Sequence, residues 1–169
     1  MTTTITGADG VSKVQTGAIE HGDLPSGSVL QVVSASTTAA QSTTSTSYID
    51  TGLSVAITPS STSSKVKIEF VFTSIHIASG VAAGCSFRIM RDSTSLYTAG
   101  AQHAFYAGHG DEGLGGITYR PYMDMALDSP STTSAITYKV QVATHNSGAI
   151  TINYSSNFKA TIMATEIAG

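Results

Sequence analysis

The sequence predicts an all-β protein, an antiparallel β-sandwich of the jelly-roll kind with about eight strands and an extended N-terminal arm. Apolar and polar residues alternate in several runs, the period-2 pattern of strands that bury one face. Short links rich in Ser, Thr, Pro and Gly separate the runs, as turns do. No window shows a helical period. Many short strands with polar links are typical of sandwiches and jelly rolls.

The alternating runs place the expected strands along the chain. The last long runs are the clearest, and in "AITYKVQVAT" the side chains of Ile136, Tyr138, Val140 and Val142 are predicted to face inward. The full set of expected strands covers residues 28–35, 51–59, 65–72, 85–92, 117–128, 136–143, 148–154 and 159–167.

The run "ITYRPYMDMALD" at 117–128 also alternates. Pro121 inside this run predicts an edge strand or a bulge, because proline cannot donate to a ladder. The more apolar of the two alternating sets is predicted to form the buried face. The other set is predicted to face outward and consists of Thr118, Arg120, Tyr122, Asp124, Ala126 and Asp128. The set predicted to face inward is Ile117, Tyr119, Pro121, Met123, Met125 and Leu127.

Turn chemistry sets the strand ends. Pro59 is expected to stop the strand that ends at Ile57, since its ring fixes φ and removes a donor. Asp92 and Ser93 suit the first positions of a tight turn. Cys85 is the only cysteine, and at the start of a strand we interpret it as a small buried thiol.

Residues 1–27 differ from the rest and are predicted to form an extended anchoring arm, with the β-sandwich domain at 28–169. Their apolar residues are too widely spaced to form a core, yet such side chains favour burial. We therefore expect the arm to pack on a neighbouring chain. The predicted anchoring residues are Ile5, Val11, Val14, Ile19 and Leu24.

Composition narrows the partners. At 169 residues the chain is long enough for one sizeable core. Only 11% of residues are charged, the net charge is −3, and the 24 Ser and 24 Thr supply most of the polarity. No basic cluster or long apolar run is present, so we expect no nucleic-acid partner and no membrane insertion. The start lacks the features of a signal peptide, which predicts synthesis in the host cytoplasm.

The stretch "QHAFYAGHGDEGLGG" at 102–116 is the one segment that resembles a chemical site. Its "HGDEG" spacing would make Asp111 and Glu112 diverge on a strand, whereas zinc needs three or four converging ligands. No serine stands in an activating context. We therefore expect no catalytic residue, no metal and no cofactor. A plain loop and a recognition loop both remain open, and the candidate contacts are Tyr106, His109, Asp111 and Glu112.

Three segments carry a family resemblance. "ITPSSTSSKV", "RDST" and "DSPSTTSAITYKVQ", in this order within residues 27–167, resemble the jelly-roll domain of structural and tail-fibre proteins of tailed bacteriophages, especially marine ones. The upstream "GADGVSKVQTGAI" is similar to the linking segments that precede such domains. The resemblance implies a jelly-roll fold and a place in a virion.

It follows that we expect a protein of the virion surface and no enzyme. The first hypothesis is a homotrimeric capsid-decorating protein or head fibre, bound to other virion proteins of the capsid or tail through its arm. The alternative is a tail-fibre tip that binds a receptor or a host-surface glycan. Its available aromatic residues are Tyr48, Tyr97, Phe105, Tyr106 and Tyr119, although the chain has no Trp, the side chain best suited to stacking on sugars.

Overall fold

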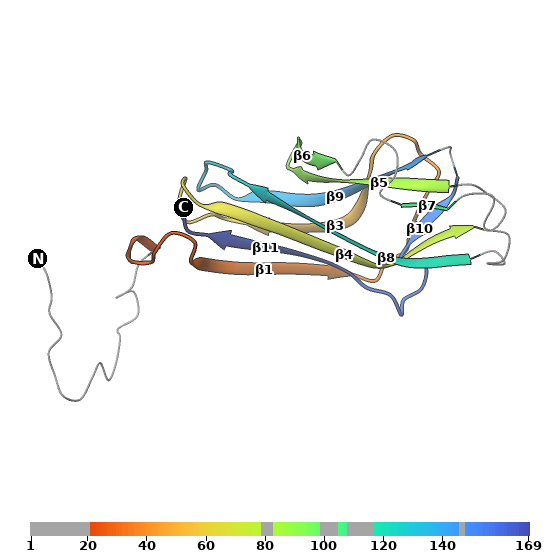
Figure 1. Ribbon diagram of the computed structural model, residues 1–169, viewed down its shortest axis with the longest axis horizontal. Coiled ribbons are helices and arrows are strands. Elements are labelled where there is room, and N and C mark those ends of the chain that lie inside the picture. Colours follow the sequence, from red (N-terminus) through yellow and green to blue (C-terminus); the bar gives the residue numbers. More distant parts are fainter. Residues whose placement is uncertain (1–20, 79–82, 99–104, 108–116, 146–147) are drawn as a thin grey trace, which may run out of the picture.

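A computed structural model describes residues 21–78, 83–98, 105–107, 117–145 and 148–169. These residues form two facing β-sheets, as predicted (Figure 1). A short 3-10 helix, η1 (His21–Asp23), precedes the first strand. The strands of the first sheet, sheet A, are β1 (Val29–Thr37), β11 (Ala160–Ile167), β4 (Lys65–Ala78), β10 (Ile150–Ile152), β2 (Gln41–Thr43) and β8 (Ile117–Asp128). Those of sheet B are β3 (Ile49–Ile57), β9 (Ile136–His145), β5 (Ala83–Arg91), β6 (Thr94–Thr98) and β7 (Phe105–Ala107).

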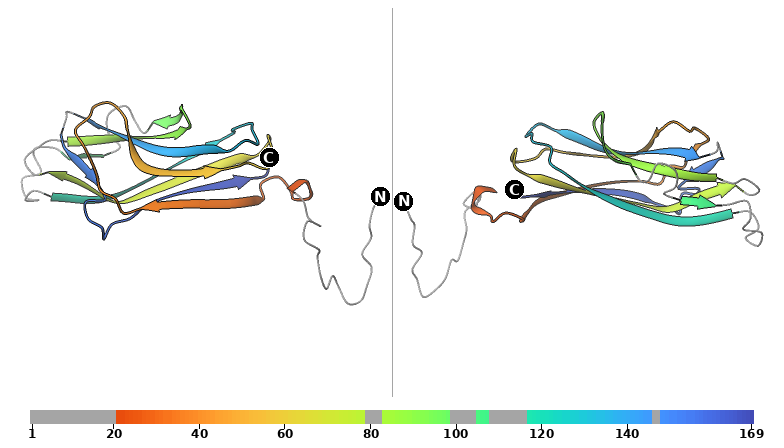
Figure 2. Two further views of the ribbon diagram at one scale, coloured as in Figure 1. Left: turned by 180° about the vertical axis from the view of Figure 1, so that it is seen from behind. Right: turned by 45° about the horizontal axis from the view of Figure 1, so that its top comes forward.

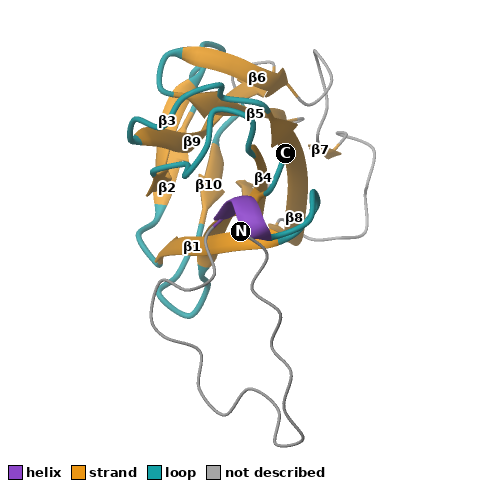
Figure 3. Ribbon diagram, turned by 90° about the vertical axis from the view of Figure 1, so that its left-hand side faces the viewer, coloured by secondary structure: helices purple, strands orange, loops and turns teal. Residues whose placement is uncertain are grey.

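The strand order is that of a jelly roll. Sheet A carries β1, β11, β4 and β8 side by side, and sheet B carries β3, β9, β5 and β6. Every pairing is antiparallel. Numbered along the chain, these eight principal strands follow the orders 1-8-3-6 and 2-7-4-5. Two interleaved four-stranded sheets of this kind are the double Greek key of a jelly roll. The all-β sandwich prediction is therefore confirmed, and Figure 3 shows the two layers from one end.

The core fills the space between the sheets. The side chains predicted to face inward on β9 are all buried, and so are Phe87 and Ile89 of β5. Aromatic rings join the layers, since Phe72 of β4 stacks on Phe87 with ring centroids 5.1 Å apart. Cys85 is fully buried, and burial raises the pKa of its thiol to about 12. The neutral thiol thus behaves as a small core side chain.

The predicted strand ends are mostly within two residues of the observed ones, but β4 continues to Ala78, six residues beyond its predicted end. β3 ends at Ile57, two residues before Pro59, and Val66 restarts the inward phase on β4 with no exposed surface. The turn between β5 and β6 consists of Asp92 and Ser93, and Asp92 has a φ of 51°. Asp tolerates the left-handed region better than most residues, which explains its place in this turn.

Three short strands were missed, and for a common reason. β2 and β6 lie in Ser/Thr-rich segments that show no apolar alternation. β7 lies inside the stretch at 102–116 that we interpreted as a loop, and its backbone pairs with β5. A strand of three to five residues is too short for period 2 to appear.

The predicted facing of β8 is wrong over residues 121–128, the part of the strand whose side chains are described. Met123, Met125 and Leu127 are 74%, 56% and 58% exposed, whereas Tyr122 packs against the core and Asp128 is buried. The prediction of an edge strand or bulge at Pro121 is confirmed on both counts. Within the described residues β8 pairs with β4 alone, and the register shifts opposite Pro121.

The two ends of the sandwich border different segments of the chain (Figure 2). The C-terminal end is where Val29, Lys65, Asp128 and Ile167 meet across sheet A. There the chain that enters β1 is fastened, since the Gly27 amide donates to Ala168 and the Ala168 amide to Ser28. We call the opposite end the loop end. The strands that end there precede residues 79–82, 99–104, 108–116 and 146–147.

Candidate interaction surfaces

An apolar stripe, formed by Met123, Met125 and Leu127, follows the outer face of β8. These three side chains stand opposite Val71, Glu69 and Lys67 of β4 in the ladder. Lys67 and Glu69 form an ion pair of 3.0 Å, so the charges beside the stripe are paired with each other. The stripe itself carries no charged group. Large apolar side chains gathered on one strand of a surface commonly mark a protein contact.

The free edge of β8 lacks two of the amide donors that a further strand would need. The Met125 amide donates to the Asp124 carboxylate at 2.8 Å, so one donor of this strand is already bound. Since backbone amides alternate sides along a strand, Pro121 shares the phase of Met125, and it has no amide hydrogen to offer. Proline and side chains that cover an edge are common protections against edge-to-edge pairing. A backbone ladder along this edge would therefore be interrupted at Pro121 and Met125.

Tyr122 explains why β8 turns its more polar side inward. Its ring stacks on Phe87 at 4.8 Å, and its hydroxyl donates to Asp124 at 2.9 Å. Burial and the hydrogen bond to Asp124 raise the pKa of Tyr122 well above its usual range, so the hydroxyl remains a donor. The Tyr122 hydroxyl and the Asp124 carboxylate thus satisfy each other by a hydrogen bond.

Asp128 fixes the C-terminal end of β8 to sheet B. Both of its carboxylate oxygens accept from the Arg91 guanidinium, at 2.9 and 2.8 Å, and the Tyr138 hydroxyl donates to it at 2.8 Å. Burial and this hydrogen bond raise the pKa of Tyr138 far above its usual range. Both bonds come from one guanidinium nitrogen, Nη1, and hydrogen bonds between charged partners are stronger than neutral ones. This cluster holds the two sheets together where β8 ends.

Glu166 of β11 is a second buried carboxylate at the same end, and its side chain has no exposed surface. It accepts from the Ser60 amide at 2.7 Å, the Ser60 hydroxyl at 2.6 Å and the Gln31 amide group at 2.6 Å. Burial alone raises its pKa, but these hydrogen bonds outweigh that effect and lower the pKa from 4.5 to about 2. The carboxylate therefore stays charged and connects the β3–β4 link to β1.

The outer face of sheet B carries a polar network. Asp50 accepts from Lys139 at 2.9 Å and from Gln141, and these hydrogen bonds lower its pKa. Gln141 in turn accepts from Arg88 at 2.7 Å, and the Arg88 guanidinium lies 4.3 Å from the centre of the Tyr48 ring. Arg88 thus occupies a face of Tyr48 that a sugar ring would need.

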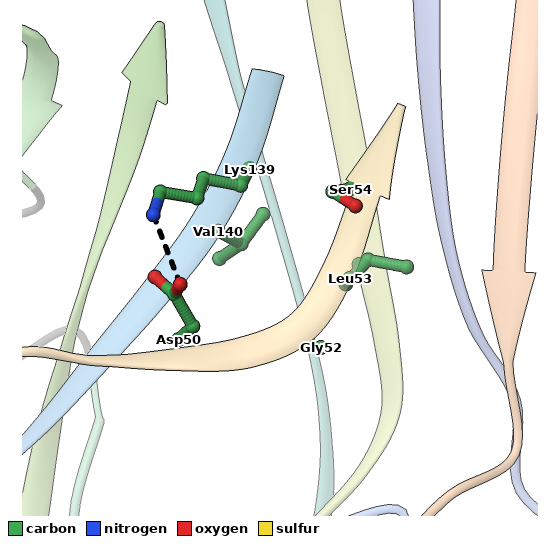
Figure 4. A pocket seen from close by; sticks show the side chains of 6 residues that line it. All are labelled: Asp50, Gly52, Leu53, Ser54, Lys139 and Val140. Atoms are coloured by element: carbon green, nitrogen blue, oxygen red, sulfur yellow. Dashed lines mark hydrogen bonds and ion pairs between the residues drawn. The ribbon is translucent and has the colours of Figure 1, made fainter. Parts of the chain in front are cut away.

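A small hollow lies where β3 bends beside this network (Figure 4). Gly52 has a φ of +76°, a conformation that glycine adopts readily, and the register between β3 and β9 shifts here. The hollow measures about 70 Å³ and is lined by Asp50, Leu53, Lys139 and their neighbours. Pockets for small-molecule ligands usually measure roughly 300 to 1,000 Å³, so this hollow suits a few water molecules.

Most of the predicted site residues lie outside the described residues. This holds for His109, Asp111 and Glu112 of the candidate recognition loop, and for Ile5, Val11, Val14 and Ile19 of the arm. Tyr106 lies in β7, where its backbone pairs with Gly84, but its side chain is not described. Leu24 follows η1 and is 37% exposed.

The aromatic residues proposed for glycan stacking differ in their exposure. Of the aromatic residues proposed for glycan stacking, Tyr97 is 42% exposed, Tyr48 is covered by Arg88, and the side chains of Phe105, Tyr106 and Tyr119 are not described. Within the ranges given above, no three His, Cys, Asp or Glu side chains gather as metal ligands would. In the same part of the chain no helix is long and apolar enough to cross a bilayer.

Sequence reasoning missed the apolar stripe, although it named the same three residues as core. The sequence did contain a signal. Tyr122, Asp124, Ala126 and Asp128 share one face of β8, and whether this face is buried depends on whether the two carboxylates find partners. Glu166 was missed altogether. The "TEI" that ends β11 gives no sign that its acid points inward.

No protein-family model matches the chain, and no curated protein sequence matches it. Among solved structures the chain is similar to VP2 of infectious bursal disease virus in a subviral particle, with a TM-score of 0.40, 14% identity and coverage of 82% of this chain and 37% of that chain. Derived T=1 particles of that virus give 0.37, 14%, 82% and 36%, and its Gt strain gives 0.31, 15%, 82% and 38%. The chain thus spans less than two fifths of those proteins. At these TM-scores the likeness says nothing of function, and the jelly-roll assignment rests on the strand order.

Proposed function

We propose that this chain is a structural protein of a bacteriophage exterior, a homotrimer that decorates the capsid or forms a head fibre. It acts without catalysis and binds other virion proteins through its N-terminal arm. The observation that carries the proposal is a rigid jelly roll whose described surface offers an apolar stripe for protein contact. Fold alone does not determine function, so the sequence resemblance supplies the virion context.

The arm fits a role in attachment. Its apolar residues are spaced too widely for a core of their own, and the chain that follows it is fastened to the sandwich by Gly27, Ser28 and Ala168. An arm that binds the particle and is fixed to the sandwich at its other end holds the sandwich in place on the particle. The Ser and Thr side chains that cover the outer strands supply solubility with few charges.

The alternative function is a tail-fibre tip that binds a receptor or a host-surface glycan. Tyr97 favours it, because this side chain on the edge strand β6 is 42% exposed and an exposed ring can stack on a sugar. Tyr48 gives it no support, since Arg88 lies over its ring.

Antibody labelling of phage particles that contain this protein tests the proposal. Electron microscopy of particles decorated with a gold-labelled antibody against the chain should show label on the head. Label confined to the end of a tail fibre would favour the adhesion alternative. Particles that remain unlabelled while the antibody binds the purified chain would contradict a virion role.

A further inference from the structure

We infer that the apolar stripe of β8 is where copies of this chain meet one another, with the three stripes side by side around the axis of the trimer. The inference rests on the trimer of the proposed function and names the surface that forms it. It starts from the three most exposed large side chains of β8, Met123, Met125 and Leu127, which are all more than half exposed on one face of one strand.

Charge favours a second copy as the occupant. Near a rotation axis each side chain meets its own copies, so a charged group there would face like charges at short range. The stripe avoids this problem. The Asp124 carboxylate is bound to the Tyr122 hydroxyl and the Met125 amide, and Asp128 is bound to Arg91. Both carboxylates are therefore held on the inner side of β8, and only thioether and aliphatic groups remain outside.

The edge geometry selects the manner of contact. An exposed edge strand of twelve residues ordinarily invites pairing with another strand. Here Pro121 lacks a donor and Asp124 occupies the Met125 amide, so a continuous sheet across two copies would leave gaps in its ladder. Side-chain packing does not need those backbone groups. Methionine is well suited to it, since its flexible chain adapts to an identical neighbour.

The exposed apolar area of the stripe suits the centre of an interface whose remaining area comes from the residues beside it. Three side chains of this size and exposure offer on the order of 300 Å² of apolar surface, comparable to the largest patch of many monomers. A stable pair buries about 800 Å² on each partner. The stripe thus supplies the apolar centre of the interface, and the neighbouring row of Val71, Glu69 and Lys67 on β4 supplies the start of its rim.

Two opposite substitutions of one residue test this inference in the full-length chain. Met125→Glu and Met125→Lys place a charge in the middle of the stripe, and on an axis both signs meet their own copies. We expect light scattering to give three times the chain mass of 17.3 kDa for the wild type and a single-chain mass for both variants at the same concentration.

The matched controls are Val32→Glu and Val32→Lys. Val32 is 53% exposed on β1, at the opposite edge of the same sheet, and these variants should remain trimers. Unchanged circular dichroism and melting would show that every variant folds. Trimers in both Met125 variants would overturn the inference and leave the trimer itself standing. Dissociation by one sign only would mean that the stripe faces a charged patch of the neighbouring copy and not another stripe, and would also overturn the inference.

A covalent test measures contact between identical residues. Cys85 is buried, so Met125→Cys introduces an accessible thiol, and mild oxidation by dissolved oxygen should join two copies through a disulfide. A covalent pair on a non-reducing gel, absent for Val32→Cys, is the expected result. A trimer without such a pair would refute contact at the stripe. A wild-type monomer at micromolar concentration would remove both the trimer and this inference, while antibody labelling would still decide the virion role.

Discussion

The two ends of the sandwich are built on different principles. The C-terminal end contains two buried carboxylates, Asp128 and Glu166, each of which joins segments far apart in the sequence. At the loop end the strands that frame the remaining segments end at Ala78, Ala107 and His145, and there the first residues of β5 pair with the last residues of β7 and β9.

The difference suggests a division of labour. The chain enters β1 at the C-terminal end, where Gly27 and Ala168 are joined by a hydrogen bond. The candidate recognition loop lies between Ala107 and Ile117, whose ladder partners Ala83 and Ala78 lie at the loop end. Under the proposed function, attachment and any recognition would thus be separated by the length of a rigid sandwich. Stability should then reside mainly at the C-terminal end, and contact at both ends.

Acid should weaken the C-terminal end through Glu166. Its pKa is lowered on folding, so its contribution is fully present above pH 4.5 and is lost as the pH falls towards about 2. The loss should approach about 3 kcal/mol of unfolding free energy, at 1.36 kcal/mol for each pKa unit. Urea unfolding measured between pH 7 and pH 2 provides the curve.

The control for this prediction is Glu166→Gln, which keeps the shape but cannot titrate. The difference between the two curves isolates Glu166, because the other acids contribute to both. We expect the variant to be less stable at pH 7, since charge-assisted hydrogen bonds from Ser60 and Gln31 become neutral ones. Parallel curves for the two proteins would show that Glu166 does not link pH to folding.

Removing the cation beside Asp128 should have the next largest effect. Arg91→Ala leaves a buried carboxylate with only the Tyr138 hydroxyl, and it should cost about 2 kcal/mol, less than the 3 to 5 of a fully buried pair because Arg91 is partly exposed. The matched control is Lys139→Ala, which breaks the more exposed pair with Asp50 and should cost at most about 0.5 kcal/mol. Equal losses in urea unfolding would contradict the special role of this end.

Whether the sequence predicts the position of a residue depends on which interaction determines that position. The long strands follow from period 2 because burial of one face dominates their energetics, as on β9. The facing of β8 does not follow, since apolar content favoured Met123, Met125 and Leu127 while ring stacking of Tyr122 and the Arg91 pair decided otherwise. Partners contributed by distant strands cannot be read from one strand's pattern. The stripe became visible only once the fold fixed which face was covered.

Deleting residues 1–26 should change stability little and assembly greatly. The truncated chain still begins before β1 and retains the bonds among Gly27, Ser28 and Ala168, so the melting temperature should fall by only a few degrees. Without Ile5, Val11, Val14, Ile19 and Leu24 the protein should no longer be incorporated into particles. Quantification of the chain in purified particles measures this, and normal incorporation would rule out the arm as the anchor.

The smallest expected effect on stability belongs to the candidate recognition loop. Replacing His109, Asp111 and Glu112 together with Ala should change the free energy of unfolding by no more than about 0.5 kcal/mol, as exposed substitutions do. A structural zinc site would behave differently, because roughly 10 kcal/mol or more of metal binding would be coupled to folding. Melting with and without a chelator separates the two cases. If chelation collapses the fold and metal co-purifies in stoichiometric amount, the loop is a metal site and both of its other interpretations fail. If stability is unchanged and phage adsorption to the host falls, the loop is a recognition surface. The loop end then contributes contact without stability, in contrast to the carboxylates of the C-terminal end.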